Sequence, residues 1–281
     1  MLVIPLVDPI ALCAVVAGLV YAAADRRVRR ARGHRAPRAR GWAFFAGLAV
    51  LVLALTGPID AAVASSFSMH MVQHLMLTMV AAPLLLLGAP LTLALAAWPK
   101  GSRRSFAAVL HSAPARIVSN PRVAWASFFV VLWTAHLTGL YESALRNDGV
   151  HALEHVAFLV TALVFWAPIV RADPSPSALS YPGKILYLFV AMPAMALLGL
   201  TIVSANQVLY PTYARAEGFA RALADQRSAG AIMWAGTMVL IAPALGIVLW
   251  EWMAADEREA RRVDARLARG VAIEPIEGSP G

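Results

Sequence analysis

Five of the seven histidines in this 281-residue chain fall in three short segments. His70 and His74 are spaced four residues apart, His151 and His155 repeat that spacing, and His136 precedes the second pair. On a helix, residues four apart share a face, so both imidazoles of a pair can approach one ion. Neutral imidazole is the side chain that most often binds zinc or copper. The pattern therefore predicts a metal site built from these five histidines.

Glu154 lies inside the second pair, so that residues 151–155 spell H-x-x-E-H. In one class of zinc hydrolases this motif supplies two ligands and a general base, which makes a membrane metallohydrolase using His151, Glu154 and His155 one interpretation. The carboxylate could instead fix the tautomer of a ligand histidine, or stabilise a helix start through the helix dipole. Paired histidines from two helices can also ligate haem. The motif alone leaves copper, zinc and haem open, as well as histidines that merely pack at a membrane boundary.

The composition decides which kind of element must position these residues. Hydrophobic residues make up 60% of the chain and charged residues only 14%, against about 25% charged residues in soluble domains. Too few polar side chains are available to coat a water-soluble globule of this size. The lone cysteine, Cys13, cannot form a disulfide framework or a CxxC metal site. The chain is therefore predicted to be a multi-pass membrane protein.

Seven apolar stretches are long enough to cross about 30 Å of hydrocarbon. Backbone amides in that layer need partners within the chain, and Leu and Ala runs without strand-like alternation indicate helices. We therefore expect an all-α fold of seven transmembrane helices, and Pro83 and Pro90 are expected to bend the third. The predicted spans are 6–24, 41–57, 70–98, 122–140, 151–170, 185–204 and 229–253.

The basic residues predict how these helices are oriented. Connections on one side, together with the C-terminal segment, hold twenty of the 24 Lys and Arg residues, and the other side holds four. The positive-inside rule then puts the N-terminus outside and the C-terminus in the cytoplasm. The five histidines all fall at the outer ends of the third, fourth and fifth helices. No basic domain remains between the spans to bind nucleic acid.

The domain organisation follows from the same pattern. Residues 1–253 are predicted to form a single seven-helix transmembrane domain, whose first helix is not a cleaved signal peptide because the Arg cluster follows its apolar stretch. Residues 254–281 are predicted to be a cytoplasmic tail that is amphipathic at first and then disordered. The segment 101–120 is expected to lie along the inner membrane surface as a short amphipathic helix.

Four segments resemble the CtaG-type cytochrome c oxidase assembly proteins. The most specific is HMVQHLMLTMVAAPLLLLGAPL, and the others are HLTGLYESAL, HALEHVAFLVTALVFWAPI and DQRSAGAIMW, at residues 70–91, 136–145, 151–169 and 225–234. Two positions depart from the family pattern: Thr138 stands where a proline is expected, and Ala231 replaces one of a glycine pair. Neither departure affects a candidate ligand.

The resemblance implies an integral membrane assembly factor for haem-copper cytochrome c oxidase, located in the bacterial inner membrane. Copper handling is the usual proposal for this family, so we expect the histidine site near the periplasmic face to bind or deliver copper, with Glu154 beside it. The implied partners are an oxidase subunit or a copper chaperone, together with membrane lipid. A metallohydrolase or a haem-binding cytochrome remains the alternative.

Overall fold

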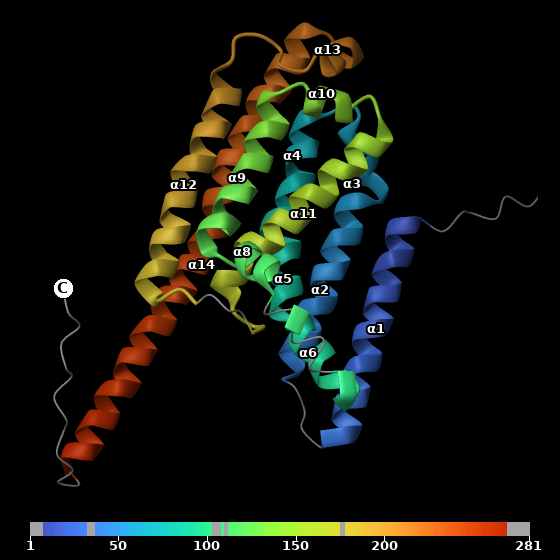
Figure 1. Ribbon diagram of the computed structural model, residues 1–281. Coiled ribbons are helices and arrows are strands. Elements are labelled where there is room, and N and C mark those ends of the chain that lie inside the picture. The colour runs from blue at the N-terminus through green and yellow to red at the C-terminus, as the bar shows by residue number, and fades with distance from the viewer. Residues whose placement is uncertain (1–7, 33–36, 103–107, 110–111, 175–177, 269–281) are drawn as a thin grey trace, which may run out of the picture.

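The computed structural model describes residues 8–32, 37–102, 108–109, 112–174 and 178–268, and all regular structure within them is helical (Figure 1). The elements are α1 (Pro9–Arg32), α2 (Arg38–Leu55), α3 (Gly57–Val63), α4 (Phe67–Leu75), the π-helix η1 (Met76–Ala81), α5 (Ala82–Leu87), α6 (Pro90–Ala97), the 3-10 helix η2 (Lys100–Ser102), α8 (Ala113–Val118), α9 (Pro121–Leu137), α10 (Leu140–Ala144), α11 (Asp148–Val170), α12 (Tyr181–Ser204), α13 (Pro211–Glu217) and α14 (Phe219–Ala268).

Six helical segments among the described residues are long and apolar enough to cross a membrane: Pro9–Ala31, Arg38–Leu55, Phe67–Ala97, Asp148–Val170, Tyr181–Ser204 and Phe219–Ala268. The prediction of an all-α, multi-pass membrane protein is therefore confirmed. The predicted span 122–140 corresponds to α9, which has 17 residues and is only about 25 Å long. The count of seven spans stays a prediction, as does the orientation.

The bundle has two distinct ends (Figure 1). One end, called the histidine end below, is formed by the short helices α3, α10 and α13, and the opposite end carries α6 and α8. Helix α14 projects beyond the bundle at the opposite end and is continuous through the first part of the predicted tail, as far as Ala268. Residues 269–281 lie outside the described residues. Within the predicted interfacial segment 101–120, the structure describes the six-residue helix α8 and the end of η2.

The predicted third helix is divided into α4, η1, α5 and α6, and it bends at two places. The π-helical turn η1 ends just before Pro83, whose ring nitrogen cannot donate to the helical ladder. The second break is at Ala89, which is left-handed with a φ of 50° directly before Pro90. There the Tyr21 hydroxyl donates to the Gly88 carbonyl at 2.8 Å, which satisfies an acceptor at the break.

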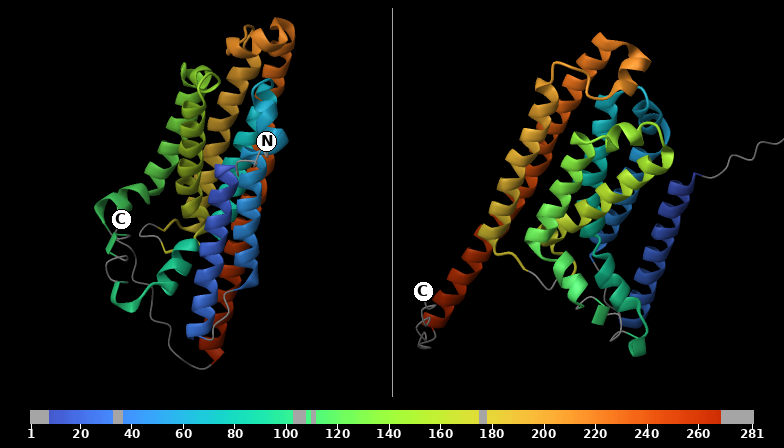
Figure 2. Two further views of the ribbon diagram at one scale, coloured as in Figure 1. Left: turned by 90° about the vertical axis from the view of Figure 1, so that its right-hand side faces the viewer. Right: turned by 45° about the horizontal axis from the view of Figure 1, so that its top comes forward.

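Helices α12 and α14 run side by side in both views (Figure 2). They approach most closely at two glycines: a Cβ on Gly199 would lie 2.9 Å from the Gly230 carbonyl oxygen, and a Cβ on Gly230 would lie 2.8 Å from that of Gly199. Small residues allow helix backbones to come this close in a membrane. Helix α4 packs against the same helix α14, so this pair supports the helix that carries the first two histidines.

Candidate metal centre

Two helix starts position the histidine pairs. At the N-terminus of α4, Ser66 accepts a hydrogen bond from the Met69 amide, and Asp225 of α14 accepts from the Phe67 amide at 2.6 Å. At the start of α11, the Asn147 side chain accepts from two backbone amides of the first turn. Such caps satisfy amides that have no partner within the helix. Both helices are therefore fixed at the turn that presents the histidines.

The structure brings all five predicted histidines into one cluster at the histidine end. Their ring centroids are 4.3 Å apart for His70 and His74, 4.2 Å for His151 and His155, 5.6 Å for His74 and His155, and 6.0 Å for His74 and His136. The side chains come from α4, α9 and α11. The Phe158 ring packs against His74 from the side of the core, with centroids 4.6 Å apart.

Several polar atoms of this cluster are buried without a hydrogen-bond partner. Both ring nitrogens of His74, Nε2 of His136 and both carboxylate oxygens of Glu154 are in this condition. Buried polar atoms almost always have a partner, and leaving one without costs about 1–3 kcal/mol. The unprotonated ring nitrogen of neutral His74, Nε2 of His136 and the oxygens of an ionised Glu154 each offer a lone pair to a cation. A bound metal ion would supply the interaction that the protein itself does not.

The ligand atoms form two overlapping groups. One consists of His70, His74 and His155, and the other of His70, His151 and Glu154; within each group one ligand atom per residue lies within 4.8 Å of the others. Nε2 of His70 is 3.3 Å from Nε2 of His151. Two nitrogens bound to one tetrahedral ion at about 2.0–2.1 Å are about 3.3 Å apart. The first group is fully buried and the second is partly exposed, with His70 common to both.

Gln73 fixes the tautomer of His155. Its amide nitrogen donates to the Ala54 carbonyl at 2.8 Å and to Asp60 Oδ1 at 3.1 Å, so its Oε1 must face His155 Nε2, 3.1 Å away. The His155 Nε2–H therefore donates to this oxygen, which leaves Nδ1 as the ring nitrogen with a lone pair. A partner of this kind orients most metal-binding histidines.

Two tyrosine hydroxyls orient the ring of His70. Nδ1 of His70 is 2.7 Å from the Tyr141 hydroxyl, which is 3.4 Å from the Tyr213 hydroxyl, and Tyr213 donates to the Val63 carbonyl. Burial raises the pKa of both phenols, so they stay protonated. If His70 Nδ1–H donates to Tyr141, donation in a single direction runs through both hydroxyls to the Val63 carbonyl. The lone pair of His70 then lies on Nε2, which faces His151.

His136 belongs to neither group. Its Nδ1–H donates to the Leu132 carbonyl at 2.8 Å, so the lone pair lies on the buried Nε2 beside His74. Its ring centroid is 6.0 Å from that of His74.

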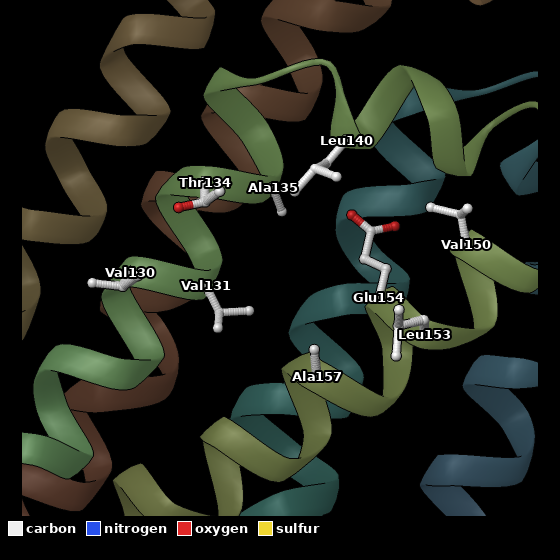
Figure 3. A pocket seen from close by; sticks show the side chains of 9 residues that line it. All are labelled: Val130, Val131, Thr134, Ala135, Leu140, Val150, Leu153, Glu154 and Ala157. Carbon is white, nitrogen blue, oxygen red and sulfur yellow. The ribbon is translucent and has the colours of Figure 1, made fainter.

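Glu154 accepts no hydrogen bond from the residues that the structure describes, so the tautomer-fixing role considered from the sequence is not seen. Helix α11 begins at Asp148, which puts Glu154 beyond the first turn, where the helix dipole acts. The Glu154 carboxylate points into a pocket of about 290 Å³ between α9 and α11 (Figure 3). The other lining side chains are almost all apolar: Val130, Val131, Thr134, Ala135, Leu140, Val150, Leu153 and Ala157. Glu154 therefore belongs both to the lining of this pocket and to the partly exposed ligand group.

A comparison with known protein families finds one family that matches most of the chain. Residues 19–255 match the family described as cytochrome c oxidase caa3 assembly factor, Caa3_CtaG. The chain belongs to this family. The match includes every histidine of the cluster, Glu154 and the residues that hold them. The resemblance seen in the sequence is thereby confirmed.

The curated relatives are mycobacterial proteins described as uncharacterized. Proteins of Mycobacterium bovis and Mycobacterium tuberculosis are each 30% identical over 273 residues, or 94% of this chain, and one of Mycobacterium leprae is 30% identical over 261 residues. The chain spans about two fifths of the length of these relatives (41%, 41% and 40%). No solved structure matches the chain significantly.

Two residues inside the family motifs were assigned no role from the sequence. Gln73 separates the first histidine pair, and Tyr141 follows His136 in the second motif; both are buried and hold ligand histidines. Asp225 opens the fourth motif and Tyr213 lies in none, and neither contact could be predicted locally because each acts across more than 140 residues of sequence.

Proposed function

We propose that this member of the caa3 assembly factor family binds copper at the histidine cluster and supplies it to a haem-copper oxidase. The observation that carries the proposal is the set of buried imidazole nitrogens without partners, above all both nitrogens of His74. Imidazole suits copper and zinc, and the family gives copper the preference because its oxidase requires that metal. An oxidase subunit or a copper chaperone is the expected partner.

The geometry favours an ion over haem. A porphyrin bound by two histidines lies between their rings, but the rings of this cluster are packed against one another at centroid distances of 4.2 to 6.2 Å. An ion needs only the short rotations that aim lone pairs at a common point.

The two ligand groups suggest how copper would pass through the protein. His70, His74 and His155 form the buried position, and His70, His151 and Glu154 form the position nearer the pocket. Because His70 belongs to both, an ion can move between them without losing all of its ligands at once. We place the histidine end on the periplasmic side of a bacterial inner membrane, since most basic residues lie toward the other end.

Metal analysis of the detergent-purified protein tests the proposal. We expect stoichiometric copper without a Soret band in the wild type, and loss of both copper and oxidase maturation in His74→Ala. His34→Ala is the control, because His34 lies in the Arg-rich connection away from the three histidine segments. Wild-type copper content and full oxidase maturation in His74→Ala would refute the proposal.

A zinc hydrolase is the second candidate, because a pocket adjoins the carboxylate that would act as its base. In that case Glu154→Gln should leave zinc bound and abolish turnover. If the protein is a copper donor, the Glu154→Gln variant should still bind copper at the buried position, but it should transfer copper to an acceptor more slowly. Measuring metal content and transfer rate in this one variant separates the two candidates.

A further inference from the structure

A second pocket, of about 400 Å³, lies far from the histidines, where α11 ends, α12 begins and α14 leaves the bundle. Its polar lining consists of Arg171, Lys184, Glu251 and Arg258, with Tyr181 and Trp250 among the remaining side chains. Three cations and one anion leave a formal excess of two positive charges. The metal centre uses none of these residues.

Lys184 is the most buried charge in this pocket, with a side chain only 5% exposed. Its Nζ lies 3.7 Å from Glu251, beyond normal hydrogen-bond distance, and 5.7 Å from the centre of the Tyr181 ring. An ammonium group has three N–H donors, and a buried charge is costly unless hydrogen bonds compensate it. Lys184 therefore has donors to offer to an anion.

The two arginines also keep donors free for a ligand. Arg171 closes α11 in the left-handed conformation, with a φ of 47°, and its guanidinium donates to the Leu179 carbonyl at 3.3 Å. Farther along α14, Arg261 pairs with Glu257 and Arg262 with Glu259, whereas Arg258 forms no ion pair with any residue that the structure describes. Arg258 thus differs from its neighbours in having no carboxylate partner.

We propose that this pocket binds the phosphate group of an anionic phospholipid. Phosphate is the anion whose oxygens match several convergent Arg and Lys donors. The pocket lies where the span α11 ends and the span α12 begins, beside α14, and Trp250 next to it is 69% exposed. Trp and Tyr gather at headgroup level, and basic pockets between spanning helices bind anionic headgroups. A lipid therefore explains the aromatic rim, which free phosphate would not require.

Lipid titration followed by native mass spectrometry tests this assignment in a neutral detergent. We expect phosphatidylglycerol to bind more tightly than phosphatidylcholine, and Arg258→Gln to weaken phosphatidylglycerol binding by roughly five-fold, the loss typical of one basic residue near a membrane surface. Arg261→Gln is the matched control on the same helix and should bind like the wild type. Both positions are exposed, so neither variant should impair folding.

Equal binding of phosphatidylglycerol by both variants and the wild type would overturn the proposal. A parallel titration with inorganic phosphate distinguishes the two sources of the anion: if free phosphate displaces phosphatidylglycerol at equal concentration, the ligand is not a lipid and the assignment fails. Copper content should be unchanged in Arg258→Gln, so this result is independent of the metal centre.

Discussion

At the scale of single residues, the spacing of the histidines predicts which side chains meet, but not which nitrogen of each ring is free. That choice depends on partners from other segments, such as the Ala54 carbonyl and Asp60, which orient Gln73 against His155. No pattern within one segment can reveal such contacts. The sequence therefore identifies the candidate ligands, and only the fold assigns their tautomers.

Gln73→Leu tests this assignment. The substitution removes the acceptor for the His155 Nε2–H, so the ring is free to rotate or change tautomer, and metal affinity should fall about 10- to 100-fold. Gln207→Leu is the control, because Gln207 is exposed in the loop after α12. Metal titration of both purified variants measures the effect. Unchanged affinity in a folded Gln73→Leu protein would mean that Gln73 does not orient the ligand.

At the scale of elements, the predicted helix 70–98 shows what a sequence pattern leaves out. Its two prolines predict a bend, and the structure has breaks near both, but the π-helical turn directly after His74 was not expected. Its stability depends on distant partners, since Trp166 of α11 donates to the Thr78 carbonyl at 2.9 Å. The short helices α3, α10 and α13 were also missed, because with five to seven residues each they are too short to resemble a span.

The α12–α14 contact gives a prediction about stability. In Gly230→Ala the new methyl group would meet Val203 and the Gly199 carbonyl, so the helices must separate, and we expect a loss of about 1–3 kcal/mol. Gly246→Ala is the matched control on the same helix, because a Cβ there meets nothing within 4 Å. Thermal unfolding in detergent compares the two variants. Equal unfolding temperatures would contradict a close-packed crossing at Gly230.

The contact between α10 and α13 predicts a pH dependence. Burial alone would raise the pKa of Glu142, but hydrogen bonds from Thr212 and Arg146 outweigh it and lower the pKa from its usual value. A carboxylate whose pKa is lowered by folding stabilises the folded state at pH values above its unfolded-state pKa. This contribution is lost as the pH falls through the folded-state pKa. The wild type should therefore lose this stabilisation below about pH 4. Glu142→Gln has no carboxylate and should lack the stabilisation at every pH. Unfolding temperatures measured from pH 3 to 7 test this; parallel curves for the two proteins would rule it out.

At the scale of the whole molecule, composition and hydropathy were sufficient to predict an all-α membrane bundle, because the bilayer imposes both helix and length on each span. The number of crossings is harder to predict, since α9 is only 17 residues long. The histidine cluster bears directly on this question. His70 lies at the start of α4 and His151 at the start of α11, and their Nε2 atoms are 3.3 Å apart.

Two helices that both begin at the same face and run in the same direction require a return crossing between them. Segment 67–97 carries the chain from the histidine end to the opposite end, and α9 carries it back (Figure 1). We therefore expect α9 to be a seventh span, which puts the two termini on opposite sides of the membrane. The positive-inside rule then puts the N-terminus outside and the C-terminus in the cytoplasm. Alkaline phosphatase, which is active only in the periplasm, should be active when fused after Arg146 and inactive when fused at the C-terminus. Activity at the C-terminal fusion, or none after Arg146, would contradict this topology.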